Sequence, residues 1–144
     1  MNKVGIDTNV FIYTLDNSSP HHKKCDNFLK DTENELFTTT KNVSEFIAVC
    51  TKIGVDREKM NGMYNEIKSN ITILYPTEDS LKTFEQLNEK YQPKGNRVYD
   101  VEIVSVFTTN NISKIATVNI DDFKNITEIE LIDLDKYKIN EKIY

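Results

Sequence analysis

Short apolar segments that favour β-strands alternate with longer segments of helical periodicity along this chain, and no other feature limits its fold as strongly. The strand-like segments are residues 3–6, 35–39, 71–75, 114–118 and 129–132, and helical spacing of apolar residues occurs in 10–15, 20–31, 42–50, 56–68, 77–90 and 98–109. Because neighbouring parallel strands require crossover helices, this alternation favours a mostly parallel sheet with helices on both faces. We therefore expect an α/β sandwich.

Polar residues and prolines indicate where several of these elements begin. Ser19 is suited to cap a helix whose first residue is Pro20, and Asn42 is suited to cap the helix that follows it. Residues 71–75 are apolar enough to predict a buried strand, whereas residues 119–122 predict a polar turn between the last two strands.

The length of 144 residues predicts a single domain, since domains commonly hold on the order of 100 to 150 residues. A hydrophobic fraction of 38%, with four Gly and three Pro, indicates one packed core and no long linker. We expect the domain to cover residues 1–135 and residues 136–144 to form a C-terminal tail.

Membrane insertion is not expected, because no apolar run reaches the roughly 18 residues that a spanning helix requires. Cys25 and Cys50 do not form a Cys-x-x-Cys pattern, and polar residues follow Met1 where a signal peptide would be apolar. These features predict a cytoplasmic protein with reduced thiols that fill apolar space on helices.

Four polar residues that are far apart in the sequence are expected to meet at one edge of the sheet. Asp7 and Asn119 directly follow predicted strands, and Glu45 and Asp100 lie in the first turn of predicted helices. Sites in open α/β sheets lie beyond the carboxyl ends of the strands, where crossover helices also begin, so these positions can converge. An acidic residue after a strand can equally be a helix cap or a solvated turn residue.

Clustered carboxylates repel one another unless a cation neutralises them. Oxygen ligands without nearby His or Cys suit Mg²⁺ or Mn²⁺, which keep several waters and bind substrate phosphate through open positions. The 18 Lys and Arg against 23 Asp and Glu give a net charge of -5, so a bound cation would have to supply the positive charge that a nucleic acid requires. Phosphodiester hydrolysis is the chemistry that this arrangement favours.

Four segments resemble, in order, the motifs of PIN-domain nucleases. Residues 4–11 (VGIDTNVF) resemble the strand-Asp-Thr-Asn start, and residues 42–46 (NVSEF) resemble the second motif, a Ser-Glu pair that opens a helix. Residues 95–104 (GNRVYDVEIV) resemble the glycine-to-aspartate third motif, and residues 115–123 (IATVNIDDF) resemble the closing Thr-x-Asn/Asp-x-x-Asp-Phe motif. The resemblance extends over nearly the whole chain.

This resemblance implies a three-layer α/β/α sandwich with a mostly parallel central sheet and a metal-dependent endoribonuclease activity. It also implies an RNA substrate and, since many such proteins are VapC-type toxins, an antitoxin protein as a partner. The family's three acidic metal-holding positions correspond to Asp7, Glu45 and Asp100. The resemblance therefore places catalysis and Mg²⁺ or Mn²⁺ binding on these residues.

The fourth position departs from the family pattern. Many members carry Asp where this chain has Asn119, whose neutral carbonyl binds a cation more weakly. We count Asn119 among the catalytic candidates and Asp122 among the metal ligands, with Asp121 as the other possible substitute. The departure leaves the number of metal ions open, and it supports an alternative function as a PIN-fold binding or scaffold module whose catalytic site has decayed.

Several other polar residues lie beside these motifs. Thr8 and Asn9 can donate hydrogen bonds to the site or cap a helix, and Thr117 resembles a hydroxyl that orients the site. Three cations flank the second and third motifs and can contact RNA phosphates, although isolated cations near turns are more often only solvated: Lys41, Lys94 and Arg97.

Two further expectations concern the class of enzyme and its assembly. A dehalogenase-like phosphatase would carry Asp-x-Asp after the first strand, and Asn9 stands where its second acid would be, so we give that class little weight. Family resemblance suggests a homodimer, and Met60, Met63 and Tyr64 can face a partner or belong to an ordinary core.

Overall fold

The computed structural model describes residues 1–137, and a five-stranded parallel sheet forms its centre. The strand order across the sheet is β3-β2-β1-β4-β5, and the strands are β1 (Asn2–Ile6), β2 (Asn34–Thr39), β3 (Thr72–Leu74), β4 (Lys114–Thr117) and β5 (Glu130–Asp133). The chain thus builds outward from β1 to β3 and then returns to the other side of β1. The prediction of a parallel α/β sheet is confirmed.

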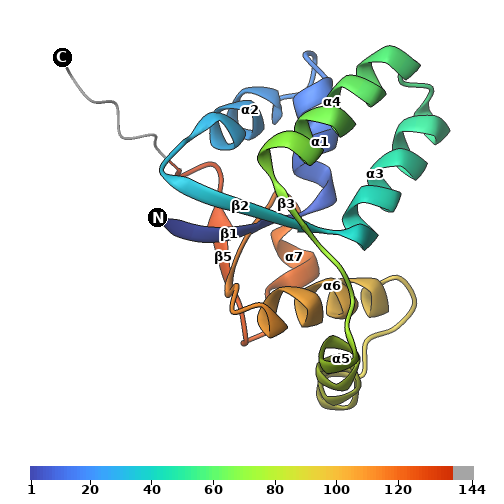
Figure 1. The fold of residues 1–144 in the computed structure, drawn as a ribbon, viewed down its shortest axis with the longest axis vertical. Helices are drawn as coiled ribbons and strands as arrows, with labels where there is room; N and C mark the ends of the chain where they lie inside the picture. Colours follow the sequence, from blue (N-terminus) through green and yellow to red (C-terminus); the bar gives the residue numbers. More distant parts are fainter. Residues whose placement is uncertain (138–144) are drawn as a thin grey trace.

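Helices cover both faces of this sheet, as Figure 1 shows. The helices are α1 (Thr8–Leu15), α2 (His22–Lys30), α3 (Thr40–Ile53), α4 (Arg57–Asn70), α5 (Glu78–Tyr91), α6 (Arg97–Thr109) and α7 (Ile120–Phe123). Helices α1 to α4 lie on one face, and α5, α6 and α7 lie on the other. The result is the expected three-layer sandwich.

Each strand contributes to two separate hydrophobic cores because successive side chains point to opposite faces of a sheet. In β1, Val4 and Ile6 belong to the core under α1 to α4, and Gly5 faces Phe107 of α6 in the other core. In β4, Ala116 belongs to the first core and Ile115 to the second. The two cores together hold the sheet between the two layers of helices.

Gly5 allows α6 to approach the sheet closely. A Cβ atom at this position would lie 2.7 to 2.9 Å from three ring atoms of Phe107, which is too close for two carbon atoms. Phe107 is fully buried, so its ring has little room to retreat. The glycine in front of Asp7 is therefore a packing requirement.

Several predicted boundaries were wrong, each for a local reason. Helix α2 begins at His22, because Ser19 uses its hydroxyl in a turn with the backbone N–H of His21 in place of a helix cap. Thr39, not Asn42, caps α3, and Asn42 is the N3 residue of a capping box. Residues 119–122 do not form a simple turn, since α7 starts at Ile120.

The prediction of a buried strand at residues 71–75 was also wrong, because β3 lies at the edge of the sheet. Thr72 is exposed there, and Ile73 and Leu74 are only partly buried. An edge strand has one neighbour, so apolar content alone did not determine its burial.

Met60 and Met63 lie in the core between α4 and the sheet, with 8% and 7% of their surface exposed. They cannot face a partner, and Tyr64 packs against the same core. Of the two readings that the sequence leaves open for these residues, burial therefore supports the ordinary core, and the homodimer stays a prediction of the family resemblance alone.

The C-terminal segment is attached to the fold as far as Tyr137. Its hydroxyl group hydrogen-bonds with Asp31 and accepts from Asn34 Nδ2 at 2.9 Å, and its ring meets Phe28 edge-on. The remainder of the expected tail, residues 138–144, lies outside the described residues. Among residues 1–137, no helix has both the length and the apolar character that crossing a membrane demands.

Candidate active site

Asp7 stands at the carboxyl end of β1, next to the point where the strand order reverses between β1 and β4. It precedes α1, yet its carboxylate does not cap that helix, which removes the simplest structural explanation for the residue. The Thr117 hydroxyl at the end of β4 donates a 2.8 Å hydrogen bond to Asp7 Oδ2. The predicted orienting role of Thr117 is consistent with this contact.

The Asp7 side chain is almost completely shielded from water, with 6% of the residue exposed. Burial is the main reason that its pKa rises from 3.8 to about 6, and the negative charges of Glu45 and Asp122 raise the pKa further. The hydrogen bonds from Thr117 and the Thr8 backbone act in the opposite direction. The charged form of Asp7 is thus less favourable in the folded protein than in water.

Glu45 enters the site from α3, one turn later than predicted, because that helix already begins at Thr40. The Thr8 hydroxyl donates to Glu45 Oε2 at 3.2 Å and accepts from Asn42 Nδ2 at 3.0 Å. Asn42 in turn accepts a 2.7 Å hydrogen bond from the hydroxyl of the capping residue Thr39. A continuous chain of hydrogen bonds therefore connects the start of α3 to Glu45.

Burial also raises the pKa of Glu45, and Glu102 adds to this effect while Thr8 and Lys41 reduce it. Thr8 thus bonds to Glu45 through its side chain and to Asp7 through its backbone, so it links two of the predicted site residues.

Asp100 lies in the first turn of α6, as predicted. Its pKa rises from 3.8 to about 7, mainly through burial and then through the negative charges of Asp122, Asp7 and Glu45, while Arg97 lowers it. The charges of Asp7, Glu45 and Asp122 thus act on Asp100, so these side chains lie near one another although they are far apart in the sequence.

Of the two Asp residues in the closing motif, Asp122 lies at the site and Asp121 does not. Asp122 is partly buried and forms an ion pair with Arg97, which also approaches Asp100 to 3.8 Å. Asp121 is 84% exposed and pairs with Lys124 at 3.2 Å. Asn119 touches the site through its backbone, whose N–H donates to the Thr117 hydroxyl at 3.0 Å. A catalytic role for the Asn119 side chain stays a prediction.

An open cavity of about 610 Å³ adjoins these acids. Its lining comes from α3, α6, α7 and the turn before α6: Lys41, Glu45, Asn96, Arg97, Tyr99, Asp100 and Asp122. Lys41 and Arg97, two of the three predicted cations, therefore face the site. Tyr99 was missed, although its position next to Asp100 at the start of a helix could have suggested it.

Within residues 1–137, no three Asp, Glu, His or Cys side chains are arranged so that they could hold a metal ion as they stand. Arg97 already supplies positive charge to Asp122 and Asp100. Carboxylates from α6 and α7 would have to reorient around a shared cation. Their oxygen donors nevertheless have the chemistry that Mg²⁺ and Mn²⁺ prefer. A bound cation would favour the charged forms of Asp7 and Asp100, which burial disfavours.

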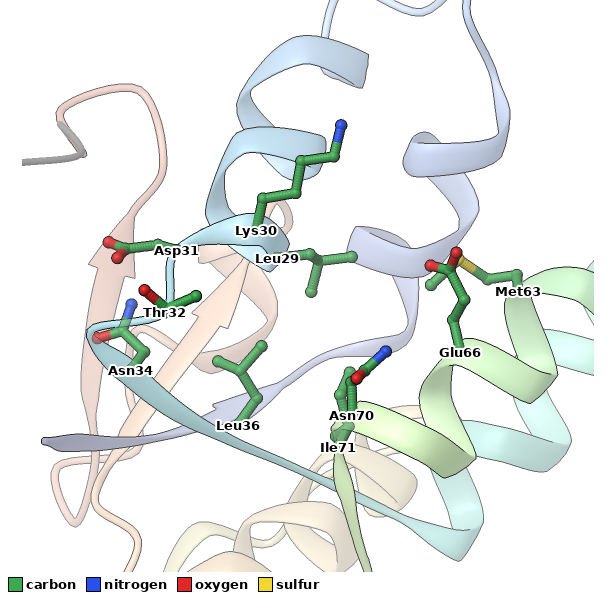
Figure 2. Close-up of a pocket in the computed structure, with 10 residues that line it drawn as sticks. All are labelled: Leu29, Lys30, Asp31, Thr32, Asn34, Leu36, Met63, Glu66, Asn70 and Ile71. Carbon is green, nitrogen blue, oxygen red and sulfur yellow. The ribbon is translucent and has the colours of Figure 1, made fainter. Parts of the chain in front are cut away.

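A second hollow, of about 310 Å³, lies at the opposite edge of the sheet (Figure 2). Asn34 and Leu36 at the start of β2 and Ile71 before β3 line it, together with residues of α2 and α4 such as Leu29 and Met63. It is distant along β2 from the carboxyl edge that holds the acids, so it does not belong to the same site.

Comparison with known proteins gives one family and a set of similar folds. Residues 4–129 match the family model described as PIN domain. No significant match is found among curated proteins. The structure of VapBC2 from Rickettsia felis, bound to a DNA fragment from their promoter, matches with a TM-score of 0.71 and 18% identity over 90% of this chain and 97% of the other.

Two further structures show the same fold. DNA-bound VapBC from Salmonella typhimurium matches with a TM-score of 0.69 and 22% identity over 93% of this chain and 99% of the other. VapC20 from Mycobacterium tuberculosis, described as a sarcin-ricin loop cleaving toxin, matches with a TM-score of 0.63 and 12% identity over 78% and 86%. At these identities the likeness concerns the fold alone.

Proposed function

The chain belongs to the PIN-domain family, and from this premise we propose that it is a Mg²⁺- or Mn²⁺-dependent endoribonuclease, the toxin of a toxin–antitoxin pair that acts in the cytoplasm. One observation carries the proposal. Glu45, Asp100 and Asp122 come from three separate helices and line one open cavity, and the negative charges of Glu45 and Asp122 raise the pKa of Asp7 at the end of β1. Carboxylates grouped beside a cavity are characteristic of sites that bind a divalent cation and a phosphate.

The proposed ligands are Asp7, Asp100 and Asp122, with Glu45 as a ligand or as the general base. When bound, a divalent cation neutralises phosphate charge and makes a water molecule more acidic. Glu45 is suited to accept a proton because burial raises its pKa, and Thr8 holds its carboxylate in place. Thr117 holds Asp7 in the same way. No histidine is required in this scheme.

The reaction is a hydrolysis in which the water oxygen forms a bond to phosphorus and the bond from phosphorus to the 3′ oxygen breaks. The water proton passes to Glu45, and the 3′ oxygen leaves and takes a proton from solvent, which makes it a hydroxyl group; Glu45 then returns its proton to solvent. The products therefore carry a 5′-phosphate and a 3′-hydroxyl. The ribose 2′-hydroxyl takes no part.

The test is end-group analysis of RNA that the purified protein cleaves with Mn²⁺. We expect 5′-phosphate and 3′-hydroxyl ends, and we expect cleavage to persist when a methoxy group replaces the 2′-hydroxyl at the scissile position. A 2′,3′-cyclic phosphate would contradict the mechanism. Full activity in the double variant Asp7→Asn with Glu45→Gln would contradict the site.

A second candidate function is that of a PIN-fold binding module without catalysis. Asn119 in place of an acid and the pairing of Arg97 with Asp122 favour it, because both reduce the affinity for a second cation. This candidate predicts that the chain still binds an antitoxin yet cleaves no RNA with any divalent cation. Cleavage that disappears in Asp7→Asn would exclude it.

A further inference from the structure

Tyr99 presents an aromatic ring at the rim of the acidic cavity. It precedes Asp100 in the first turn of α6, and 45% of its surface is exposed. Lys41, which enters from the first turn of α3, places its ammonium group 3.9 Å from the centre of this ring. Both residues line the cavity that also holds Glu45 and Asp100.

The position of this pair differs from that of other tyrosines in the described chain. Tyr75 is 69% exposed but does not line the acidic cavity. Tyr64 also carries a lysine over its ring, Lys68 at 5.4 Å, and it packs against the core of the other face. Tyr91 carries Lys90 over its ring at 5.1 Å and lines a neighbouring cavity with Asp122, but it is partly buried and its hydroxyl is bonded to Glu128. Tyr99 combines an exposed ring, a lysine and the cavity lined by Glu45, Asp100 and Asp122.

We propose that Tyr99 is the stacking platform for a nucleobase of single-stranded RNA and that Lys41 binds the phosphate of the same nucleotide. This inference rests on the proposed function, and it names the form in which the substrate is held. An aromatic ring stacks on any base, whereas a lysine attracts phosphate as a flexible point charge. A paired base could not reach the ring, since it is stacked within a helix.

The contact between Lys41 and Tyr99 explains how the subsite stays ordered without RNA. The ammonium group is held over the negative face of the ring, which keeps the cation at the mouth of an otherwise acidic cavity. A base that stacks on the ring competes for this face. Lys41 then becomes free to turn its three N–H donors towards the phosphate.

Fluorescence offers a direct test because the chain contains no Trp. In Tyr99→Trp, the new indole is the only one, and we expect adenosine 5′-monophosphate to quench it. Ribose 5-phosphate carries the same phosphate without a base and should not quench it. Tyr75→Trp is the matched control, in which neither compound should change the emission.

Binding to proteins without tryptophan provides the second measurement. By calorimetry, Tyr99→Leu should weaken the affinity for adenosine 5′-monophosphate about tenfold, and Tyr99→Phe should retain it, because base stacking on an aromatic ring commonly contributes this much. Lys41→Gln should weaken the binding of both adenosine 5′-monophosphate and ribose 5-phosphate. Equal affinities for the two compounds in the wild type, or unchanged nucleotide affinity in Tyr99→Leu, would overturn the inference.

The outcomes for the subsite and for the proposed function can be told apart. A wild type that cleaves RNA with an unchanged KM in Tyr99→Leu would refute the subsite and leave the nuclease standing. Base-dependent quenching in a protein that cleaves no RNA would support the subsite and refute the nuclease. We expect a raised KM with little change in kcat for Tyr99→Leu, since the ring does not touch the reacting phosphorus.

Discussion

At the scale of single residues, the carboxylates that meet at the site, Asp7, Glu45, Asp100 and Asp122, carry more negative charge than their surroundings stabilise. Asp7 and Asp100 both have raised pKa values, to about 6 and about 7, with burial as the first cause. Arg97 is the cation that lowers the pKa of Asp100. The folded protein therefore keeps protons on these two side chains up to a higher pH than the unfolded chain does.

We predict that the stability of the metal-free protein falls as the pH rises. A folded-state pKa above the unfolded value means that the folded protein binds more protons, so the stabilisation is complete below about pH 4, near the unfolded pKa. It is lost as the pH rises through the folded pKa of about 7 for Asp100. Urea unfolding with chelator from pH 5 to pH 8 measures this loss.

The matched variant is Asp100→Asn, which removes this ionisation and keeps the shape of the side chain. Its unfolding free energy should fall less over the same pH range, by on the order of 1 to 3 kcal/mol. Parallel pH profiles for the variant and the wild type would show that Asp100 has an ordinary pKa.

Gly5 supports a second prediction at this scale. Gly5→Ala should destabilise the protein by about 1 to 3 kcal/mol, because the new methyl group would meet the Phe107 ring. Phe107→Leu should lower the free energy of unfolding less in the Gly5→Ala protein than in the wild type, since the smaller side chain makes room for the new methyl group. Thermal unfolding of the four proteins gives the coupling, and additive losses would contradict the contact.

At the scale of elements, hydrogen bonds connect the residue that caps α3 to Glu45, one of the carboxylates of the site. Thr39 caps the helix, and the hydrogen bonds run through Asn42 and Thr8 to Glu45. Helix α5 has a capping box of the same kind, made by Thr77 and Ser80, without a connection of this sort in the contacts of the described chain. The two helices therefore form a natural pair for comparison.

We predict that Thr39→Ala and Thr77→Ala each cost about 1 kcal/mol of stability, the usual contribution of a cap. Only Thr39→Ala should also slow the proposed RNA cleavage, because it releases Asn42 and loosens the position of Glu45. Unfolding curves and cleavage rates for both variants are the measurements. Equal rates would mean that the hydrogen-bond chain does not position Glu45.

The elements also show how far the sequence could be interpreted. Alternating strand and helix patterns predicted the parallel sheet, and residue order predicted that polar residues at strand ends and acids in first helical turns converge. The edge position of β3 and the turn before α2 depend on neighbours and on one side-chain hydrogen bond, which periodicity does not encode. Whether Asp122 or Asp121 belongs to the site depends on which of the two carboxylates pairs with Arg97.

At the scale of the whole molecule, a cation at the site would connect both helical layers and the sheet. Asp7 follows β1, Glu45 belongs to α3 on one face, and Asp100 and Asp122 belong to α6 and α7 on the other. A ligand held by these residues would bind only the folded chain. Binding of this kind stabilises a protein by mass action.

We therefore predict that Mn²⁺ at millimolar concentration raises the melting temperature, and that chelator reverses the change. At a concentration about 100 times the Kd, the gain is about 2.7 kcal/mol, which corresponds to a shift of several degrees in a domain of this size. Because the net charge is -5, any salt also reduces repulsion between carboxylates, so the reference samples need NaCl at equal ionic strength. The single variant Asp100→Asn, whose charge changes by only one, should retain this screening effect and lose the specific shift. The same melting temperature in Mn²⁺ and in matched NaCl for the wild type would show that the four carboxylates do not act together as a metal site.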